Sequence, residues 1–313
     1  MDFSRRNFIA STAMLSGSLL VRPVDKLDVR EQNQPDMVLP NDFKLLILAP
    51  FWGFAGTIMQ FAEKAKNSGF DGFEIAWGDA RDKLPQVAEA AAKYDLKFGF
   101  LTNCSEGDPQ KYFDTYKNDL EKIVSQKIAK PLYVNSQTGR DFFPFEENCK
   151  YIEFAKKLSD SSGIPIYHET HRSRMLFAAH IAQPFIQKYK DISLTLDISH
   201  WCCVHETMLA DLAPFVDSAI AHAHHIHARI GHPEGPQVNH PAAPEWANVV
   251  EQHLKWWDKV IAQRIKAGAK YQTILTEFGP ATYMPTLPFT QQPVSDQWEV
   301  NVSMKDILRK RYQ

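Results

Sequence analysis

The sequence predicts a single α/β domain with the architecture of a (β/α)8 barrel. From residue 42 onward, short β-type segments alternate with amphipathic helical segments, and eight such units follow one another at intervals of roughly 30 residues. The roughly 270 residues that they occupy suit one barrel. An open, doubly wound sheet is the rival architecture, but it would carry a glycine-rich turn after its first strand. That position reads Ala49-Pro50-Phe51-Trp52-Gly53.

Each unit consists of a strand and the helix that follows it. The expected strands cover residues 44–49, 72–76, 97–101, 131–135, 164–169, 193–197, 221–229 and 273–277. The expected helices cover about 57–68, 84–94, 108–126, 146–161, 173–188, 207–216, 246–267 and 302–311. Residues 279–297 contain four prolines and are too long for a tight loop, so we expect them to fold over the barrel mouth.

The N-terminus is predicted to be an export signal. Residues 1–21 contain Ser4-Arg5-Arg6-Asn7-Phe8-Ile9, which resembles the twin-arginine signal, and a short apolar stretch follows it. An ordinary amphipathic helix is the alternative. Residues 22–41 are polar and contain three prolines, as in a disordered linker. The sequence therefore predicts a periplasmic protein with its barrel over residues 42–313.

Charge and composition argue against some function classes. The formal net charge is −2, and 44% hydrophobic and 23% charged residues are ordinary values for a soluble globular protein. Nucleic-acid binding needs clustered excess Lys and Arg, so no nucleic-acid partner is expected. No apolar run of about 18 residues follows the N-terminal segment, so no membrane span is expected there. The four cysteines include no CxxC pair and are expected to be buried thiols.

Polar side chains mark the ends of four successive expected strands, where the chemistry of a (β/α)8 barrel is located. In chain order they are Glu169 and His171, Asp197 and His200, then His225, His227 and Arg229, and finally Glu277. The three residues of the seventh strand recur with a period of two and therefore point to the same side. We expect the carboxylates and one imidazole to converge at the barrel mouth.

Three carboxylates and one imidazole cannot be buried together without a compensating charge. A divalent cation supplies that charge. Oxygen-rich ligation with one histidine favours Mn²⁺, Co²⁺ or Mg²⁺ over a structural zinc site, with Zn²⁺ as a further option. Taken singly, each residue has a structural explanation: Glu169 or Glu277 as an ion-pair partner, Asp197 as a helix cap, His227 as a core histidine. His225 replaces His227 as the ligand if the register of the seventh strand slips.

Four motifs carry a resemblance to a known family. They are Tyr167–Arg172, Leu196–His200, His225–His227 and Thr276–Gly279. At these positions the chain resembles the xylose-isomerase-like barrel family of sugar isomerases and epimerases, over about residues 42–313. The resemblance implies one divalent ion per chain, held by Glu169, Asp197, His227 and Glu277. It also implies that Glu169 and Glu277 act as an acid/base pair, and that His200 and Arg229 contact substrate oxygens, with His171 as a further contact.

The same superfamily includes apurinic endonucleases, which carry extra zinc-binding histidines at the ends of the second and third strands. Those regions read Ile75-Ala76-Trp77 and Phe100-Leu101-Thr102-Asn103 here, so a DNA-repair role is not expected. Barrels of this family often pair, which makes a homodimer compatible with the resemblance.

Three more residues are candidates for substrate contact. Trp52 and Trp77 follow the first and second strands, where their rings would pack on the C–H face of a sugar or else seal the barrel top. Arg140 follows the fourth strand, where it would hold a substrate hydroxyl or carboxylate or else form a structural ion pair.

Together these observations predict a metal-dependent isomerase or epimerase that transfers a proton next to a sugar carbonyl through an enediolate. Phosphorylated sugars are scarce outside the cytoplasm and no phosphate-cradling loop is visible, so the expected substrate is a non-phosphorylated sugar or keto-sugar. A lyase or hydratase acting on a 3-keto-glycoside would use the same base and is the first alternative. A non-catalytic periplasmic sugar-binding protein is the second.

Overall fold

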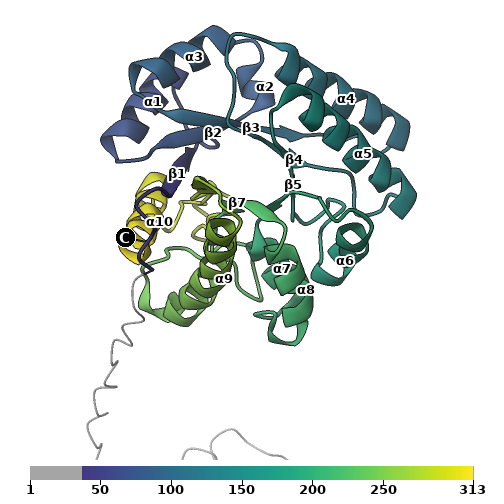
Figure 1. Ribbon diagram of the computed structural model, residues 1–313. Coiled ribbons are helices and arrows are strands. Elements are labelled where there is room, and N and C mark those ends of the chain that lie inside the picture. The colour runs from purple at the N-terminus through teal and green to yellow at the C-terminus, as the bar shows by residue number, and fades with distance from the viewer. Residues whose placement is uncertain (1–36, 313) are drawn as a thin grey trace, which may run out of the picture. The chain divides into compact units, whose positions relative to one another are not determined.

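The computed structural model describes residues 37–312 as a closed barrel of eight parallel strands, which confirms the predicted fold class (Figure 1). The strands are β1 Lys44–Pro50, β2 Gly72–Ala76, β3 Lys97–Asn103, β4 Val134–Gln137, β5 Ile166–Glu169, β6 Leu194–Leu196, β7 Ala223–His227 and β8 Tyr271–Leu275. They pair in chain order, and β8 closes on β1 with Lys44 opposite Tyr271 and Leu48 opposite Leu275. The expected export signal and residues 22–36 of the expected linker lie outside the described residues.

Helices surround the strands (Figure 1). They are α1 Ile58–Asn67, α2 Trp77–Ala80, α3 Leu84–Lys93, α4 Pro109–Ser125, α5 Phe145–Ser162, α6 Ala179–Lys188, α7 Ile198–His205, α8 Ala213–Ile220, α9 Ala247–Lys266 and α10 Gln297–Arg311. Local signals set several of their ends. Thr57 forms a capping box with Gln60 at α1, Asp108 caps α4, and Gly163 ends α5 in the left-handed conformation. Over residues 37–312, no helix has both the length and the apolar composition that crossing a membrane requires.

The structure differs from the predicted elements in several places. β4 covers Val134–Gln137 where residues 131–135 were predicted, α6 begins at Ala179 and not at residue 173, and the short helix α2 was not predicted. The largest differences follow the sixth and eighth strands. The sequence predicts a helix near residues 207–216, whereas α7 already begins at Ile198 and α8 begins at Ala213. Asp197 accounts for the early start of α7, because its side chain accepts the backbone N–H of Ser199 and caps the helix. β8 ends at Leu275, so Glu277 lies on the loop beyond the strand and not within it.

Side chains fill the barrel interior below the carboxyl ends of the strands. Leu48, Tyr133, Tyr167 and Leu275 form one cluster inside the barrel, and the rings of Tyr133 and Tyr167 stack with their centroids 5.6 Å apart. Gly99 leaves room for this cluster, because a Cβ at that position would overlap the Tyr133 ring. A larger core lies between the strands and the helices. Open space for binding is therefore found toward the strand ends.

Candidate metal centre

Four ligand-type side chains converge at the carboxyl ends of β5 to β8. Glu169 is the last residue of β5, Asp197 directly follows β6, His227 ends β7, and Glu277 lies two residues beyond β8. One ligand atom from each residue lies within 4.8 Å of the other three, and all four side chains are buried. The structure thus brings together the four residues that the sequence singles out as metal ligands.

The backbone at Glu277 is held in an uncommon conformation. Its φ angle is 53°, in the left-handed region that residues other than glycine and asparagine rarely adopt. Asn301 of α10 fixes both neighbours: its side-chain oxygen accepts from the Thr276 hydroxyl at 2.7 Å and from the Phe278 N–H at 3.0 Å. These hydrogen bonds offset the free-energy cost of the left-handed backbone at Glu277. That conformation turns the Glu277 carboxylate toward the other three residues.

Several polar atoms that face one another in this cluster have no hydrogen-bond partner. They include Glu169 Oε1, Glu277 Oε2 and His227 Nδ1. His227 Nδ1 lies 2.5 Å from Glu277 Oε2 and 3.6 Å from Glu169 Oε1, without the alignment of a hydrogen bond. A buried polar atom without a partner is costly. A cation bound among these atoms would satisfy all three, so the residues fit a metal ion.

Arg229 and Ser199 hold the Asp197 carboxylate. Its Oδ1 accepts from the Ser199 N–H at 3.1 Å and from the Ser199 hydroxyl, and its Oδ2 accepts from Arg229 Nη2. Arg229 Nε also donates to the Ser199 hydroxyl at 3.2 Å. The expected metal ligand Asp197 is therefore also the cap of α7 and one half of a buried ion pair.

The charges of the cluster are not balanced by the protein alone. Three buried carboxylates face a single buried guanidinium, that of Arg229, which lies 3.7 Å from Glu277 as well as against Asp197. With His227 neutral and the carboxylates ionised, two negative charges are left over, and protons on His227 and Asp197 or a bound cation have to offset them in these buried surroundings. One divalent cation would neutralise them.

The pKa directions express the same imbalance. Burial raises the pKa of Asp197 to about 7 against the opposing effect of Arg229. Burial also acts to lower the pKa of His227, but the carboxylates of Glu277 and Glu169 outweigh it and hold that pKa well above its usual value. The cluster attracts positive charge, whether a proton or a metal cation.

A cavity of about 340 Å³ adjoins the cluster. Its lining includes Trp52, Glu74, His171, Arg229, Glu277 and Tyr283. Trp52 is 43% exposed and meets the edge of the Tyr283 ring, with centroids 5.1 Å apart. The guanidinium of Arg229 lies 4.7 Å from the centre of the same ring. An aromatic wall and the guanidinium of Arg229 thus adjoin the candidate ligands.

The other predicted contact residues divide into two groups. His200 Nε2 lies 2.7 Å from Arg229 Nη2, and the rings of His171 and His200 are 3.8 Å apart, so both histidines adjoin the centre. Trp77 does not line the cavity; it is buried at the start of α2 with its ring against Phe100. Arg140 does not line it either, since its guanidinium donates to the Ser105 carbonyl at 3.0 Å. The sequence expectation that these two contact substrate is not supported by their positions.

Sequence reasoning missed Glu74, Asn135 and Tyr283. Asn135 Nδ2 lies 2.9 Å from Glu169 Oε2 and 3.2 Å from His227 Nε2, so it ties two candidate ligands together. Glu74 was detectable as the one carboxylate within the apolar segment Gly72–Ala76. Tyr283 carries no such signal, because the proline-rich segment that holds it has no periodic pattern.

No protein family matches the sequence, and no curated protein matches it either. Solved structures do resemble it. A 3-keto-D-glucoside 4-epimerase from E. coli has a TM-score of 0.59 at 13% identity, over 85% of this chain and 99% of the other. A xylose isomerase domain protein from Alicyclobacillus acidocaldarius has a TM-score of 0.54 at 12% identity, over 85% and 97%. A probable 3-DHS dehydratase from Bacillus anthracis has a TM-score of 0.51 at 12% identity, over 85% and 99%.

These likenesses show the fold alone, a (β/α)8 barrel that this chain shares with the similar structures. The similar structures include a sugar epimerase and a dehydratase on one architecture, so the fold is compatible with more than one reaction. The reaction of this chain has to be argued from its own site.

Proposed function

We propose that this chain is a divalent-metal-dependent isomerase or epimerase that moves a proton next to the carbonyl of a non-phosphorylated sugar or keto-sugar. The observation that carries the proposal is the joint placement of Glu169, Asp197, His227 and Glu277 beside a cavity, where three buried carboxylates face the single guanidinium of Arg229. A set of buried carboxylates that binds no positive charge would be destabilising. The charge deficit and the open cavity together favour a metal-assisted reaction over a structural role.

A divalent cation held by these four residues would polarise a carbonyl and neutralise the negative charge that develops on its oxygen. Glu169 and Glu277 supply the proton transfer. They follow β5 and β8, so their carboxylates approach the site from different parts of the barrel rim. One accepts the proton from the carbon next to the carbonyl, and the other returns a proton to the opposite face.

Neighbouring residues would bind and orient the sugar. Arg229 lines the cavity, and its partner His200 Nε2 is 2.7 Å away, so substrate oxygens that reach Arg229 meet two polar groups. Trp52 offers a partly exposed ring for the C–H face of a sugar. The carboxylate-rich ligand set favours Mn²⁺, Co²⁺ or Mg²⁺ as the resident ion. The sequence-based expectation of periplasmic export is part of this proposal and favours a substrate without phosphate.

Elimination of water or an aglycone from a 3-keto-glycoside is the second candidate reaction. The observation that favours it is the likeness to a dehydratase with the same barrel. Elimination begins with the same proton abstraction by Glu169 or Glu277, and differs only in whether a proton returns or a leaving group departs at the next carbon.

The two reactions are separated by NMR in D₂O. The metal-loaded protein is incubated with 3-keto-D-glucosides, the substrate class named for the E. coli epimerase, and with free keto-sugars. Solvent deuterium at an epimerised carbon, with the aglycone retained, is the expected result. Loss of water or aglycone would assign the lyase reaction instead. Neither reaction with any of these substrates, in a protein that binds the ion, would contradict the proposed catalytic function and favour a sugar-binding protein.

A further inference from the structure

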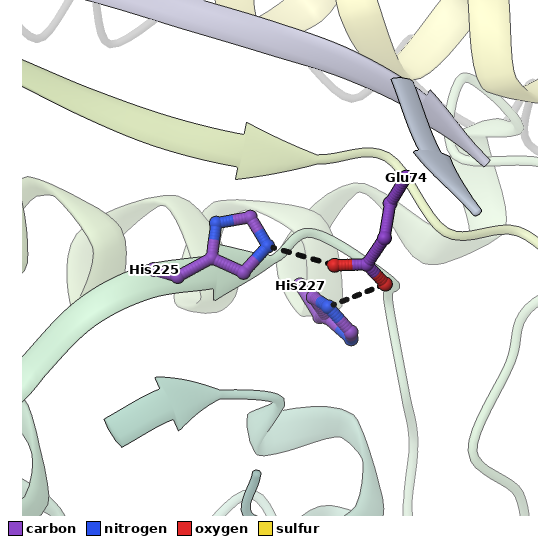
Figure 2. A group of neighbouring side chains, drawn as sticks. All are labelled: Glu74, His225 and His227. Carbon is purple, nitrogen blue, oxygen red and sulfur yellow. Dashed lines mark ion pairs between the residues drawn. The ribbon is translucent and has the colours of Figure 1, made fainter. Parts of the chain in front are cut away.

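A second group of ligand-type side chains lies deeper in the barrel than the candidate metal centre. Glu74 points inward from β2, and His225 and His227 point inward from β7. Figure 2 shows the Glu74 carboxylate reaching toward both imidazoles, one oxygen to each ring. All three side chains are buried, and Glu74 also borders the cavity. The interior of such a barrel is normally filled with apolar side chains, so this cluster needs a physical explanation.

The contacts within this inner cluster are too long to be hydrogen bonds. Glu74 Oε2 is 3.7 Å from His225 Nε2, and Glu74 Oε1 is 3.6 Å from His227 Nε2. Glu74 Oε2 and His225 Nε2 have no other partner in the described part of the chain. A buried polar atom without a partner destabilises the folded state, because it has lost its hydrogen bonds to water. A group that binds both atoms would remove this loss of stability.

The surroundings of His225 indicate what kind of group that is. Its Nδ1 lies 3.0 Å from the Thr273 carbonyl and 2.8 Å from the Thr273 hydroxyl. A carbonyl can only accept, so Nδ1 carries the proton and the neutral ring turns the lone pair of Nε2 toward the Glu74 carboxylate. Two electron-rich atoms therefore face each other across 3.7 Å.

These distances suit two ligands of one metal ion. Bond lengths of about 2.1 Å in tetrahedral geometry place neighbouring ligand atoms about 3.4 Å apart. The two carboxylate–imidazole distances are close to that value. The contact from Nδ1 to a backbone carbonyl is also what orients metal-binding histidines in general.

We propose that Glu74, His225 and His227 form a second divalent-cation site, with Zn²⁺ as its preferred ion. Two imidazoles and one carboxylate are a ligand set of catalytic zinc sites, which keep their fourth position open. Since Glu74 borders the cavity, that position is accessible to water or substrate. The nitrogen-rich inner site and the carboxylate-rich candidate centre therefore differ in the metals they favour.

His227 belongs to both sites through different ring atoms. Its Nδ1 faces Glu169 and Glu277, whereas its Nε2 faces Glu74 and the Asn135 side-chain amide 3.2 Å away, a contact that it gives up when it binds an ion. Occupation of both sites at once would require the ring to bind as an imidazolate, with the proton released to solvent. The inner site does not depend on the proposed reaction, because its other two ligands take no part in it.

Elemental analysis and anomalous diffraction test the proposal. The protein is stripped with a chelator, loaded with excess Zn²⁺ and freed of unbound metal. We expect about two ions per chain in the wild type and about one in Glu74→Gln and His225→Asn. Crystals measured at the zinc absorption edge should show an anomalous peak between Glu74 and the two imidazoles. Glu74→Gln keeps the side-chain volume and offers an amide N–H to the His225 lone pair, so it is expected to fold.

Two further variants test whether a loss of metal is specific to the inner site. Tyr167→Phe alters the same barrel interior without touching a ligand and should keep both ions. Asp197→Asn should lose the ion of the candidate centre and retain the inner one, so failure of the proposed function is seen separately from failure of the inner site. A wild-type crystal with anomalous density only among Glu169, Asp197 and Glu277 would overturn the proposal. A metal content in Glu74→Gln equal to that of the wild type would also overturn the proposal. Either result would mean that the inner cluster holds a shared proton and not a metal ion.

Discussion

The guanidinium of Arg229 and the carboxylate of Asp197 form an ion pair in which both side chains are almost fully buried. Asp197 is at the same time a candidate metal ligand and the cap of α7. Arg229 therefore has two roles at the centre: it compensates the charge of one carboxylate, and it lines the cavity beside the candidate ligands. Removal of this one side chain should affect stability, metal binding and substrate binding together.

Arg229→Gln is expected to lower the stability of the metal-free protein by about 3–5 kcal/mol, because it leaves the buried Asp197 charge without its partner. Added Mn²⁺ should restore more stability to the variant than it adds to the wild type, since a cation then replaces the missing charge. Thermal unfolding with and without Mn²⁺ measures both effects. Equal Mn²⁺ stabilisation of the two proteins would contradict this reading.

Arg309→Gln is the matched control for that experiment. Arg309 pairs with Asp71 far from the site, and both side chains are about one-third exposed. Exposed ion pairs contribute less than about 1 kcal/mol, so this variant should lose little stability and gain nothing extra from Mn²⁺.

Removal of the metal should destabilise the wild type. A ligand at a concentration of 100 times its dissociation constant stabilises the folded state by about 2.7 kcal/mol, and a chelator abolishes that contribution. Glu169→Gln, Asp197→Asn, His227→Ala and Glu277→Gln should each bind Mn²⁺ at least about 10-fold more weakly in calorimetric titration. Glu251→Gln is the control, because this half-buried carboxylate of α9 lies 3.6 Å from Arg311 and belongs to none of the candidate metal sites. Wild-type Mn²⁺ affinity in all four variants would show that these residues do not form a metal centre.

Gly231→Ala tests how closely the backbone after β7 packs under the site. A Cβ at this position would lie 2.5 Å from the Ser199 carbonyl oxygen and 2.6 Å from the Ser199 Cα, and backbone atoms cannot give way easily. The start of α7 would shift, and with it the N–H and hydroxyl that hold Asp197. We expect a loss of about 1–3 kcal/mol in stability together with weaker metal binding. Gly107→Ala, where no atom lies within 4 Å of the added Cβ, should change neither quantity.

Much of the barrel and its candidate centre could be predicted because strand parity and strand ends are local properties. Glu169, Asp197 and His227 each lie at or next to the end of a β-type segment, and the ends of parallel strands meet at one rim. The same logic failed for Trp77 and Arg140. Both follow strands, but α2 turns the Trp77 ring into the core, and a loop carbonyl binds Arg140.

Other features depend on contacts that sequence spacing does not encode. Asn301 lies on the last helix, yet it fixes the backbone on both sides of Glu277. Tyr283 reaches the cavity from an irregular segment. Glu74 could have been found, because a carboxylate within an apolar strand of a parallel barrel is an exception to the expected pattern.

Trp52→Ala should weaken substrate binding more than it slows the chemical step. The ring borders the cavity, meets Tyr283 and is not itself a candidate ligand, so its removal takes away apolar contact with the sugar and keeps the acid/base groups. We expect KM to rise roughly 10-fold with kcat changed by less than about 3-fold. Trp77→Phe replaces a buried indole that does not line the cavity with a smaller ring, and the KM of this variant should stay at the wild-type value. An equal rise of KM in both variants would show that Trp52 acts only through the packing of the rim.

Stability should fall in mild acid because of His253, a fully buried histidine of α9. Its Nε2 accepts the Gly231 N–H at 3.2 Å, and its Nδ1 lies 2.9 Å from the Val249 carbonyl, so the folded protein holds the ring neutral. Burial lowers its pKa to about 4, whereas the unfolded chain has the usual value of about 6.5. The stabilisation is thus complete above pH 6.5, and it is lost as the pH falls toward 4, because only the unfolded state takes up the proton in that window. The loss approaches about 3 kcal/mol at the lower end.

Urea unfolding at pH 7 and pH 5 measures this effect as a difference between the two pH values. His168 is also fully buried, and burial lowers its pKa to about 4, so it contributes a second loss of the same sign. His253→Gln removes one of the two titrating rings, and its free energy of unfolding should therefore decline less between pH 7 and pH 5 than that of the wild type. An identical decline in both proteins would mean that His253 is not held neutral by the fold. Because Gly231 packs on Ser199, the same variant should also weaken the support of Asp197, which links the buried histidine of α9 to the candidate metal centre.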